Sequence, residues 1–280
     1  MSRSRRAVLA GLGLAGAGAV GAFGVGRVLD GPEEEPPKAL VAGSLLSLAE
    51  QVDGATVEAR GSVAVRRQVL EGVRDPDVVG LADPRLFDGI SDRATLFATN
   101  ALVVAYDPDS EHAPAIREDW RAALASEAIE VGRTDPDTDP LGYRAVLALR
   151  LAERDGDVDA DTVLEDSRVL PEVDLLNVLE GGGLDAALAY RSMAVERGLP
   201  TVDLPVSIDF SDPEHADHYG SVAYDLPKRT VRGAPIRYGA AALTMRGEGW
   251  LDRLVSGHDR LRASGFEVPA AYPRRDVSVR

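Results

Sequence analysis

The chain has 280 residues and a net charge of −15, with 46 Asp and Glu against 31 Lys and Arg, and it contains no Cys. This acidity disfavours binding to nucleic acid or to an anionic membrane surface, because phosphate groups are neutralised by a basic face. The lack of Cys excludes disulfide scaffolds, thiolate zinc sites, iron–sulfur clusters and cysteine nucleophiles. Since Lys38 and Lys228 are its only lysines, the acidic composition is typical of proteins from extreme halophiles.

The N-terminal segment is predicted to be an export signal. Residues 1–6 hold three Arg and no acid, and the next 20 residues are uncharged. The pair Arg5-Arg6, followed by Ala-Val-Leu, resembles a twin-arginine signal. Residues 1–29 are therefore expected to act as a signal or as an uncleaved membrane anchor, and residues 30–38 as an acidic, Pro-rich tether. With no Cys for lipid attachment, the protein is expected on the extracellular face of the membrane, either anchored or released.

From Ala39 onward, short apolar runs alternate with helical patterns, which predicts an α/β fold with a largely parallel sheet. Strands are expected at 39–42, 56–59, 77–82, 129–133, 169–170, 186–190, 221–226 and 236–244. Helices are expected at 45–51, 63–72, 115–126, 140–154, 172–179, 192–197 and 250–263. The extended run 94–105 is long enough to pass between two lobes, and the residues after Pro269 are predicted to form a tail.

Four polar residues stand where a helix is expected to begin after a strand: Ser44, Ser62, Asp139 and Glu172. The first turn of a helix has free N–H groups and a partial positive charge, so it can bind an anion without Lys or Arg. In open α/β sheets these turns gather at the ends of the strands where ligands bind. Each residue alone is also an ordinary capping or first-turn residue. The pattern nevertheless shows how an acidic protein could hold an anion.

Other polar clusters point less clearly to a site. His215 and His218 have a spacing compatible with two metal ligands, but no third ligand is evident and a solvated turn is favoured. The acidic runs 135–139 and 155–161 lack the spacing of a calcium loop and are predicted to be solvated loops. Four arginines could add positive charge near helix starts, although such residues more often pair with surface carboxylates: Arg66, Arg67, Arg144 and Arg191.

Several stretches resemble, in sequence and order, the archaeal tungstate/molybdate-binding proteins of ABC importers. They include the two Gly-Ser turns, FATNALVVAY at 97–106, GRTDPDTDPLGYR at 132–144 and PEVDLLNVLEGGGLDAALAYRSMA at 171–194. The resemblance covers residues 39–265 and implies a type II periplasmic-binding-protein fold, with two α/β lobes and a ligand cleft between them. Lobe I is expected to comprise residues 39–102 and 232–280, and lobe II residues 103–231.

The resemblance also implies the residues of the binding site. Ser44 and Ser62 match the residues that hold the oxyanion through hydroxyl and backbone N–H groups, and Gly142 and Tyr190 match further ligand contacts. Asp139 and Glu172 match two carboxylates that approach the tungsten or molybdenum atom itself. Leu141 stands where the family often has Cys, and the segment 145–168 is shorter than is usual there.

The two carboxylates have a physical consequence. Sulfate and phosphate have a saturated central atom, so a nearby carboxylate only repels them, whereas tungsten and molybdenum can accept two more oxygen ligands. The implied function is capture of tungstate or molybdate and delivery to an ABC permease, by a monomer that has no cofactor and is not an enzyme. Two alternatives stay open: a binding protein for another oxyanion such as sulfate, and a hydrolase that uses Asp139 and Glu172 as an acid/base pair. The low aromatic content of 5% disfavours a sugar cleft, and the sequence leaves the choice between tungstate and molybdate open.

Overall fold

The computed structural model describes residues 35–137, 139–156, 158–226 and 229–279. The predicted signal, residues 1–29, and most of the predicted tether lie outside this part of the chain. Residues 36–280 form one compact unit, which is the unit described below. None of the helices in the described ranges is long and apolar enough to cross a membrane.

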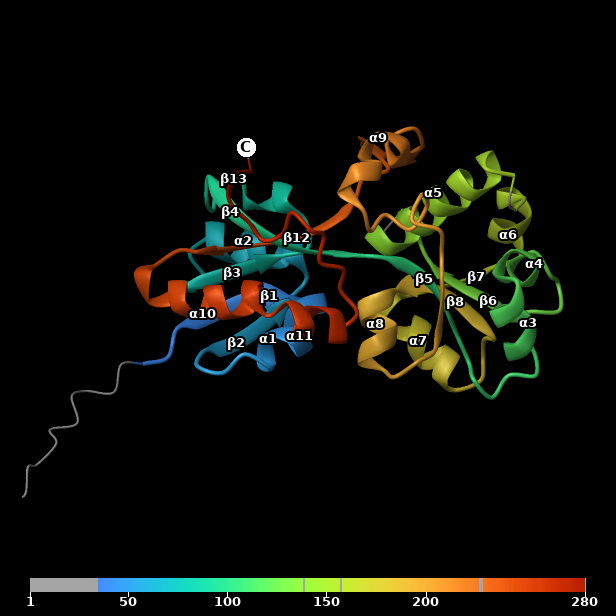
Figure 1. The fold of residues 1–280 in the computed structure, drawn as a ribbon, viewed down its shortest axis with the longest axis horizontal. Helices are drawn as coiled ribbons and strands as arrows, with labels where there is room; N and C mark the ends of the chain where they lie inside the picture. Colours follow the sequence, from blue (N-terminus) through green and yellow to red (C-terminus); the bar gives the residue numbers. More distant parts are fainter. Residues whose placement is uncertain (1–34, 138, 157, 227–228, 280) are drawn as a thin grey trace, which may run out of the picture. The chain divides into compact units, whose positions relative to one another are not determined.

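The first of two large sheets has the strand order β13-β4-β12-β3-β1-β2 (Figure 1). Its strands are β1 (Lys38–Ala42), β2 (Thr56–Arg60), β3 (Val78–Leu81), β4 (Arg93–Asn100), β12 (Ile236–Ala242) and β13 (Arg274–Ser278). With it belong the helices η1 (Gly43–Leu45), α1 (Leu46–Glu50), α2 (Ser62–Leu70), η2 (Pro84–Phe87), α10 (Met245–Ser256) and α11 (His258–Ala263). Strands β1, β2 and β3 run parallel, so the turns that follow β1 and β2 lie at the same edge of the sheet.

The second sheet has the order β7-β6-β8-β5-β9. Its strands are β5 (Leu102–Tyr106), β6 (Val131–Thr134), β7 (Arg168–Leu170), β8 (Ala186–Tyr190) and β9 (Thr201–Asp203). Its helices are α3 (Ala113–Glu118), α4 (Trp120–Leu124), α5 (Pro140–Arg154), α6 (Ala160–Asp166), α7 (Glu172–Glu180) and α8 (Arg191–Glu196). The parallel strands β6, β7 and β8 bring the starts of α5, α7 and α8 to one edge.

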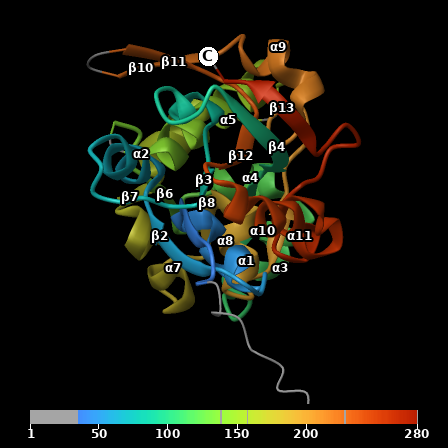
Figure 2. The same cartoon turned by 90° about the vertical axis from the view of Figure 1, so that its left-hand side faces the viewer.

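The chain passes between the sheets where β4 ends and β5 begins (Figure 1). The return segment contains η3 (Pro213–His215), α9 (Ala216–Tyr219) and a hairpin of β10 (Ala223–Leu226) and β11 (Arg229–Arg232), which is seen from the side in Figure 2. This segment contacts the beginnings of β5 and β12, because Leu102 N donates to Asp209 O at 2.9 Å and Ile236 N donates to Phe210 O at 2.9 Å.

The predicted α/β class is confirmed, but both large sheets are mixed and not largely parallel. In the first sheet β12 pairs antiparallel with β3 and β4, and in the second β5 pairs antiparallel with β8 and β9. The cause lies in the direct passage from β4 of the first sheet to β5 of the second, since a chain that leaves one sheet and directly enters the next does not return through a helical crossover. Parallel pairing needs such a crossover.

Several predicted elements are divided or extended in the structure. The helix expected at 115–126 is broken at Asp119, whose extended backbone lets its carboxylate cap α4. The last helix begins at Met245 and is interrupted at Gly257. Part of the acidic run 155–161, predicted as a loop, caps and begins α6. The predicted C-terminal tail contains β13, which pairs antiparallel with β4.

Candidate functional site

The two predicted serines lie at helix starts on the first sheet, as the sequence indicates. Ser44 lies in η1 directly after β1, and Ser62 is the first residue of α2 after β2. The hydroxyl of Ser44 accepts a hydrogen bond from the Tyr238 hydroxyl at 3.1 Å, and that of Ser62 accepts one from Ala82 N at 3.2 Å. A hydroxyl that accepts from the protein keeps its own hydrogen to donate elsewhere. Both serines can therefore donate to an oxyanion.

The start of α2 adds backbone donors to these hydroxyls. The first bond within the helix runs from Val65 N to Gly61 O at 2.9 Å, so the N–H groups of Ser62, Val63 and Ala64 have no acceptor inside the helix. The residue before the helix, Gly61, makes no side-chain cap. The first turn of α2 is thus open to an external acceptor.

Asp139 caps α5 with only one of its two carboxylate oxygens. Oδ1 accepts a hydrogen bond from Leu141 N at 3.1 Å, and Pro140 occupies the first helical position. Oδ2 is buried and has no hydrogen-bond partner in the described part of the chain. A buried polar atom without a partner costs about 1–3 kcal/mol, more when it is charged. The geometry therefore leaves one carboxylate oxygen in need of a partner from outside.

Glu172 is the first residue of α7, directly after Pro171. Burial raises the pKa of its carboxyl to about 7, and the negative charge of Asp139 adds to this effect. The two carboxylates therefore lie close enough to interact, although they belong to different helices. The residue as a whole is exposed to solvent, so a ligand could reach its carboxylate.

Tyr190, at the end of β8, lies beside Arg144 of α5. Its hydroxyl accepts a hydrogen bond from Arg144 Nη1 at 2.5 Å, which leaves the hydroxyl hydrogen for another acceptor. Burial raises the pKa of Tyr190, so the phenol stays neutral and able to donate. The pKa of Tyr238 is raised by burial as well, and it responds to the charges of both Arg144 and Glu172. The charges of Arg144 in α5 and Glu172 in α7 therefore act on Tyr238 of β12 in the first sheet.

Gly142 has a structural reason to be glycine. A Cβ at this position would lie 2.5 Å from the carbonyl carbon of Asp135 and 2.6 Å from its oxygen. Asp135 and Pro136 thus pack directly on the first turn of α5. The N–H of Gly142 is still one of the first-turn donors without an acceptor inside the helix, so its predicted ligand contact stays a prediction.

The four arginines named from the sequence have different environments. Arg66 pairs with Asp88 at 3.8 Å, and Arg191 pairs with Asp203 at 3.0 Å and with Glu267. Arg67 and Arg144, in contrast, form no ion pair with any carboxylate that the structure describes. The expectation of surface pairing is therefore wrong for Arg144. Its place in the stretch DPLGYR, next to the predicted ligand residues, is the only sequence signal that could have singled it out.

A residue that the sequence reasoning missed is Asn100, at the end of β4. Its Nδ2 donates to Ser192 Oγ at 2.8 Å and to the Tyr238 hydroxyl at 3.3 Å. Since Tyr238 in turn donates to Ser44, a chain of side-chain hydrogen bonds runs from Ser44 to the start of α8. Its sequence signal is only that FATNALVVAY places one amide among mainly apolar residues.

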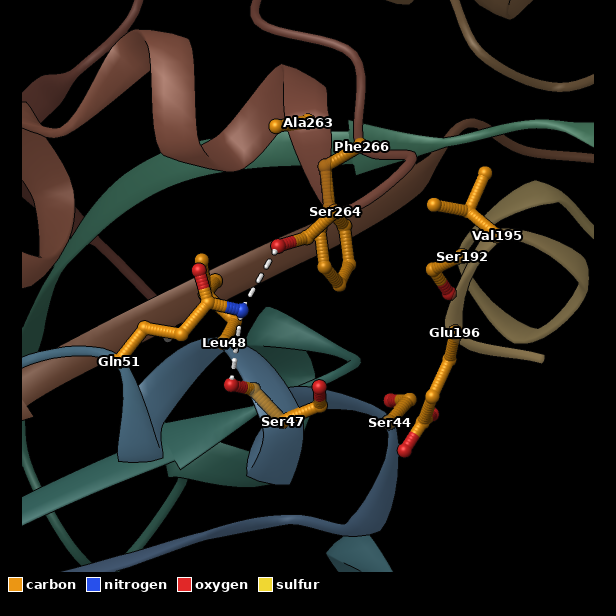
Figure 3. A pocket seen from close by; sticks show the side chains of 10 residues that line it. All are labelled: Ser44, Ser47, Leu48, Gln51, Ser192, Val195, Glu196, Ala263, Ser264 and Phe266. Carbon is orange, nitrogen blue, oxygen red and sulfur yellow. Dashed lines mark hydrogen bonds between the residues drawn. The ribbon is translucent and has the colours of Figure 1, made fainter. Parts of the chain in front are cut away.

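Ser44 also lines a cavity of about 220 Å³ between α1, α8 and α11 (Figure 3). Gln51 Nε2 closes one side by donating to Ser264 Oγ at 3.4 Å and to Ser47 O at 3.1 Å. The other predicted site residues do not line this cavity. The cavity therefore adjoins the candidate site at Ser44, and the carboxylates lie elsewhere.

Within the described ranges, no group of three or more His, Asp or Glu residues is arranged to hold a metal ion. The rings of His215 and His218 lie beside Tyr219, at centroid distances of 5.9 and 6.5 Å. The candidate site thus contains no such metal cluster in the described ranges. It consists of side-chain hydroxyls, first-turn N–H groups, Arg144 and the carboxylates of Asp139 and Glu172.

Comparison with known proteins adds three findings. The model of a family described as bacterial extracellular solute-binding protein matches residues 49–255. A relative from Haloferax volcanii, provisionally named an ABC transporter molybdenum-binding protein, is 44% identical over 288 residues, covering 96% of this chain and 93% of the relative. The molybdate/tungstate-binding protein of Thermococcus kodakarensis is 31% identical over 221 residues, covering 66% of this chain and 62% of the relative.

Among solved structures, the periplasmic molybdate-binding protein of Azotobacter vinelandii aligns with a TM-score of 0.57 at 15% identity, covering 83% of this chain and 99% of that chain. At this identity the likeness concerns the fold. It confirms the fold class predicted from the sequence, two α/β lobes.

Proposed function

The chain belongs to the family of extracellular solute-binding proteins, and on this premise we propose that it captures molybdate or tungstate and delivers the ion to the permease of an ABC importer. The ion would bind between lobe I, residues 39–102 and 232–280, and lobe II, residues 103–231. Closure of the lobes on the ion would present the loaded protein to the permease. The names of the relatives from Haloferax and Thermococcus support molybdate and tungstate as ligands.

The observation that carries this proposal is the unpartnered oxygen of Asp139 beside a second carboxylate. Oδ2 of Asp139 is buried without a hydrogen-bond partner among the described residues, and its charge acts on Glu172. Such a pair repels an oxyanion whose central atom cannot accept further ligands. Molybdenum and tungsten in their high oxidation states are hard centres that can take two more oxygens, so the same pair would bind them. The pair would thus select molybdate and tungstate over sulfate and phosphate.

The remaining groups suit the oxygens of the ion. The hydroxyls of Ser44, Ser62 and Tyr190 each accept a hydrogen bond from the protein and keep their own hydrogen to donate. The first-turn N–H groups of α2 and α7 add donors that carry no net charge. Net negative charge on the protein surface is therefore no obstacle to binding of the anion.

Family membership favours this proposal over a hydrolase that uses Asp139 and Glu172 as acid and base. An extracellular family also implies export of the chain. A monomer, either released or held by its own signal segment, is the proposed form. The acidic, lysine-poor composition agrees with the close relative from Haloferax volcanii, a haloarchaeon.

The test is titration calorimetry with tungstate, molybdate, sulfate and phosphate in concentrated KCl, on the wild type and on Asp139→Ala and Glu172→Ala. Asp174→Ala is the matched control, because Asp174 is an exposed carboxylate in the same first turn of α7. We expect the wild type and the control to bind tungstate and molybdate, and both site variants to lose at least tenfold in affinity. Unchanged tungstate affinity in both site variants would refute the role of the pair, and binding of sulfate alone would replace the proposed ligand.

A further inference from the structure

Arg144 is a cation without an anionic partner in a protein with a large excess of acids. The chain has 46 Asp and Glu against 31 Lys and Arg, so carboxylates outnumber the cations that could pair with them. Arg144 nevertheless forms one hydrogen bond, to the hydroxyl of Tyr190, and no ion pair among the described residues. A guanidinium has five N–H donors, and most of those of Arg144 are therefore left for something else.

The surroundings of Arg144 hold its guanidinium at the candidate site. Cζ lies 5.7 Å from the ring centroid of Tyr143 and 5.7 Å from that of Tyr190, within the range of cation–π attraction. Nη1 lies 2.5 Å from the Tyr190 hydroxyl, which is itself a predicted ligand contact. The two rings and this bond orient a side chain that would otherwise be flexible. The guanidinium is therefore fixed in place without being neutralised.

The charge of Arg144 also reaches the opposite sheet. Tyr238, in β12, donates to Ser44 and responds to the charges of both Arg144 and Glu172. Arg85, in η2, is another cation that responds to Arg144, but its own carboxylate partner is Asp83 at 2.7 Å. Unlike Arg85, Arg144 has no carboxylate partner among the described residues.

The balance of charge explains why a site of this kind needs such a cation. A doubly charged oxyanion that approaches Asp139 and Glu172 meets two further negative charges. Backbone N–H groups and hydroxyls stabilise an anion by their dipoles but leave the total negative charge of the ion and the two carboxylates unchanged. A guanidinium beside the site offsets part of the repulsion and can donate to oxyanion oxygens through charge-assisted hydrogen bonds.

We propose that Arg144 is the counter-charge of the oxyanion site: its guanidinium, held between Tyr143 and Tyr190, donates to an oxygen of the bound ion and offsets part of the negative charge of that ion. This inference rests on the proposed function. It assigns to Arg144 a direct contact with the ligand, so the ion takes the place of the missing carboxylate partner.

A purely structural role makes a different prediction. If Arg144 only packs against the tyrosines, its removal lowers the stability of the ligand-free protein. If it is a counter-charge awaiting an anion, the ligand-free protein holds an uncompensated cation, and a neutral replacement leaves the melting temperature unchanged or raises it. The two roles are therefore separated by the stability of the ligand-free protein.

The experiment compares wild type, Arg144→Gln and Arg144→Lys, with Arg150→Gln as the matched control. Arg150 lies on the same helix but pairs with Glu153 at 3.1 Å and with Asp161 at 2.5 Å. Molybdate and tungstate affinities are measured by calorimetry, and the melting temperature is measured with and without each ion.

We expect Arg144→Gln to bind both ions about 10- to 100-fold more weakly than wild type, Arg144→Lys to show an intermediate loss, and the control to bind normally. The melting temperature of ligand-free Arg144→Gln should equal or exceed that of wild type. Wild-type affinity in Arg144→Gln, or a ligand-free protein that is strongly destabilised or unfolded, would overturn the inference. A wild type that binds neither ion would instead overturn the proposed function.

Discussion

The raised pKa of Glu172 predicts that molybdate and sulfate bind with opposite dependence on pH. Burial and the charge of Asp139 raise this pKa to about 7 in the ligand-free protein, from an ordinary value of 4.5. In the proposed function Glu172 joins the coordination of molybdenum and must be ionised to do so, so protonation of Glu172 would compete with molybdate. Sulfate is repelled by the ionised form, so protonation favours sulfate.

The size of the effect follows from the fraction of Glu172 that is ionised. With a pKa of about 7, roughly one carboxyl in ten is ionised at pH 6 and nine in ten at pH 8. Since apparent affinity scales with the fraction of the competent form, molybdate should bind about tenfold more tightly at pH 8 than at pH 6. Any sulfate binding should weaken by about the same factor over this range.

The assay is calorimetry at pH 6, 7 and 8 in one concentrated KCl buffer, on wild type, Glu172→Gln and the control Asp174→Asn. Glu172→Gln should lose the pH dependence for both ions, while Asp174→Asn should keep it. Molybdate affinity that is constant from pH 6 to 8, or that falls in step with sulfate affinity, would refute the assignment of Glu172 to the metal centre.

Two further predictions concern the scaffold that supports the site. Gly142→Ala should lower the free energy of unfolding by roughly 2 kcal/mol, because the added Cβ would lie 2.5 Å from the backbone of Asp135. Thermal unfolding tests this, with Gly43→Ala as the control, since a Cβ at Gly43 would meet no atom within 4 Å. Asp77→Asn should lower the free energy of unfolding by about 2 kcal/mol at neutral pH. Burial alone would raise the pKa of Asp77, but hydrogen bonds from Thr244, the N–H of Lys38 and Arg246 outweigh it and lower the pKa. A carboxylate with a lowered pKa stabilises the fold at pH values above its ordinary pKa of 3.8, and this stabilisation is lost as the pH falls further. The difference in unfolding free energy between wild type and variant should therefore narrow on acidification. A difference that widens would contradict this prediction.

Most of what the sequence could predict is local. Ser62 and Asp139 were placed at helix starts because an apolar run, a small or acidic residue and a helical pattern follow one another in the chain, and the structure confirms both positions. The pairing of Pro140 with Asp139 is equally a feature of neighbouring residues. Local chemistry of this kind is independent of the rest of the fold, so it can be predicted without it.

What the sequence could not predict depends on residues far apart in the chain. Whether Arg144 finds a carboxylate is decided by side chains from several elements, and no local pattern reports it. The bond from Asn100 to Ser192 joins positions 92 residues apart. Strand β13 was predicted as a tail because its sequence lacks a strong apolar alternation, and it is a strand because β4 offers it a free edge.

The net charge of the protein bears less on anion binding than its size suggests. In about 1 M salt the screening length is roughly 3 Å, so exposed carboxylates far from the site hardly act on an ion inside it. Groups beside the ion are screened far less, because little solvent lies between them. In the proposed site, affinity would therefore be set by a short list of neighbours: donors from hydroxyls and helix starts, the cation of Arg144, and the carboxylates of Asp139 and Glu172. An acidic surface suited to brine and a site for an anion can evolve in the same chain because they act over different distances.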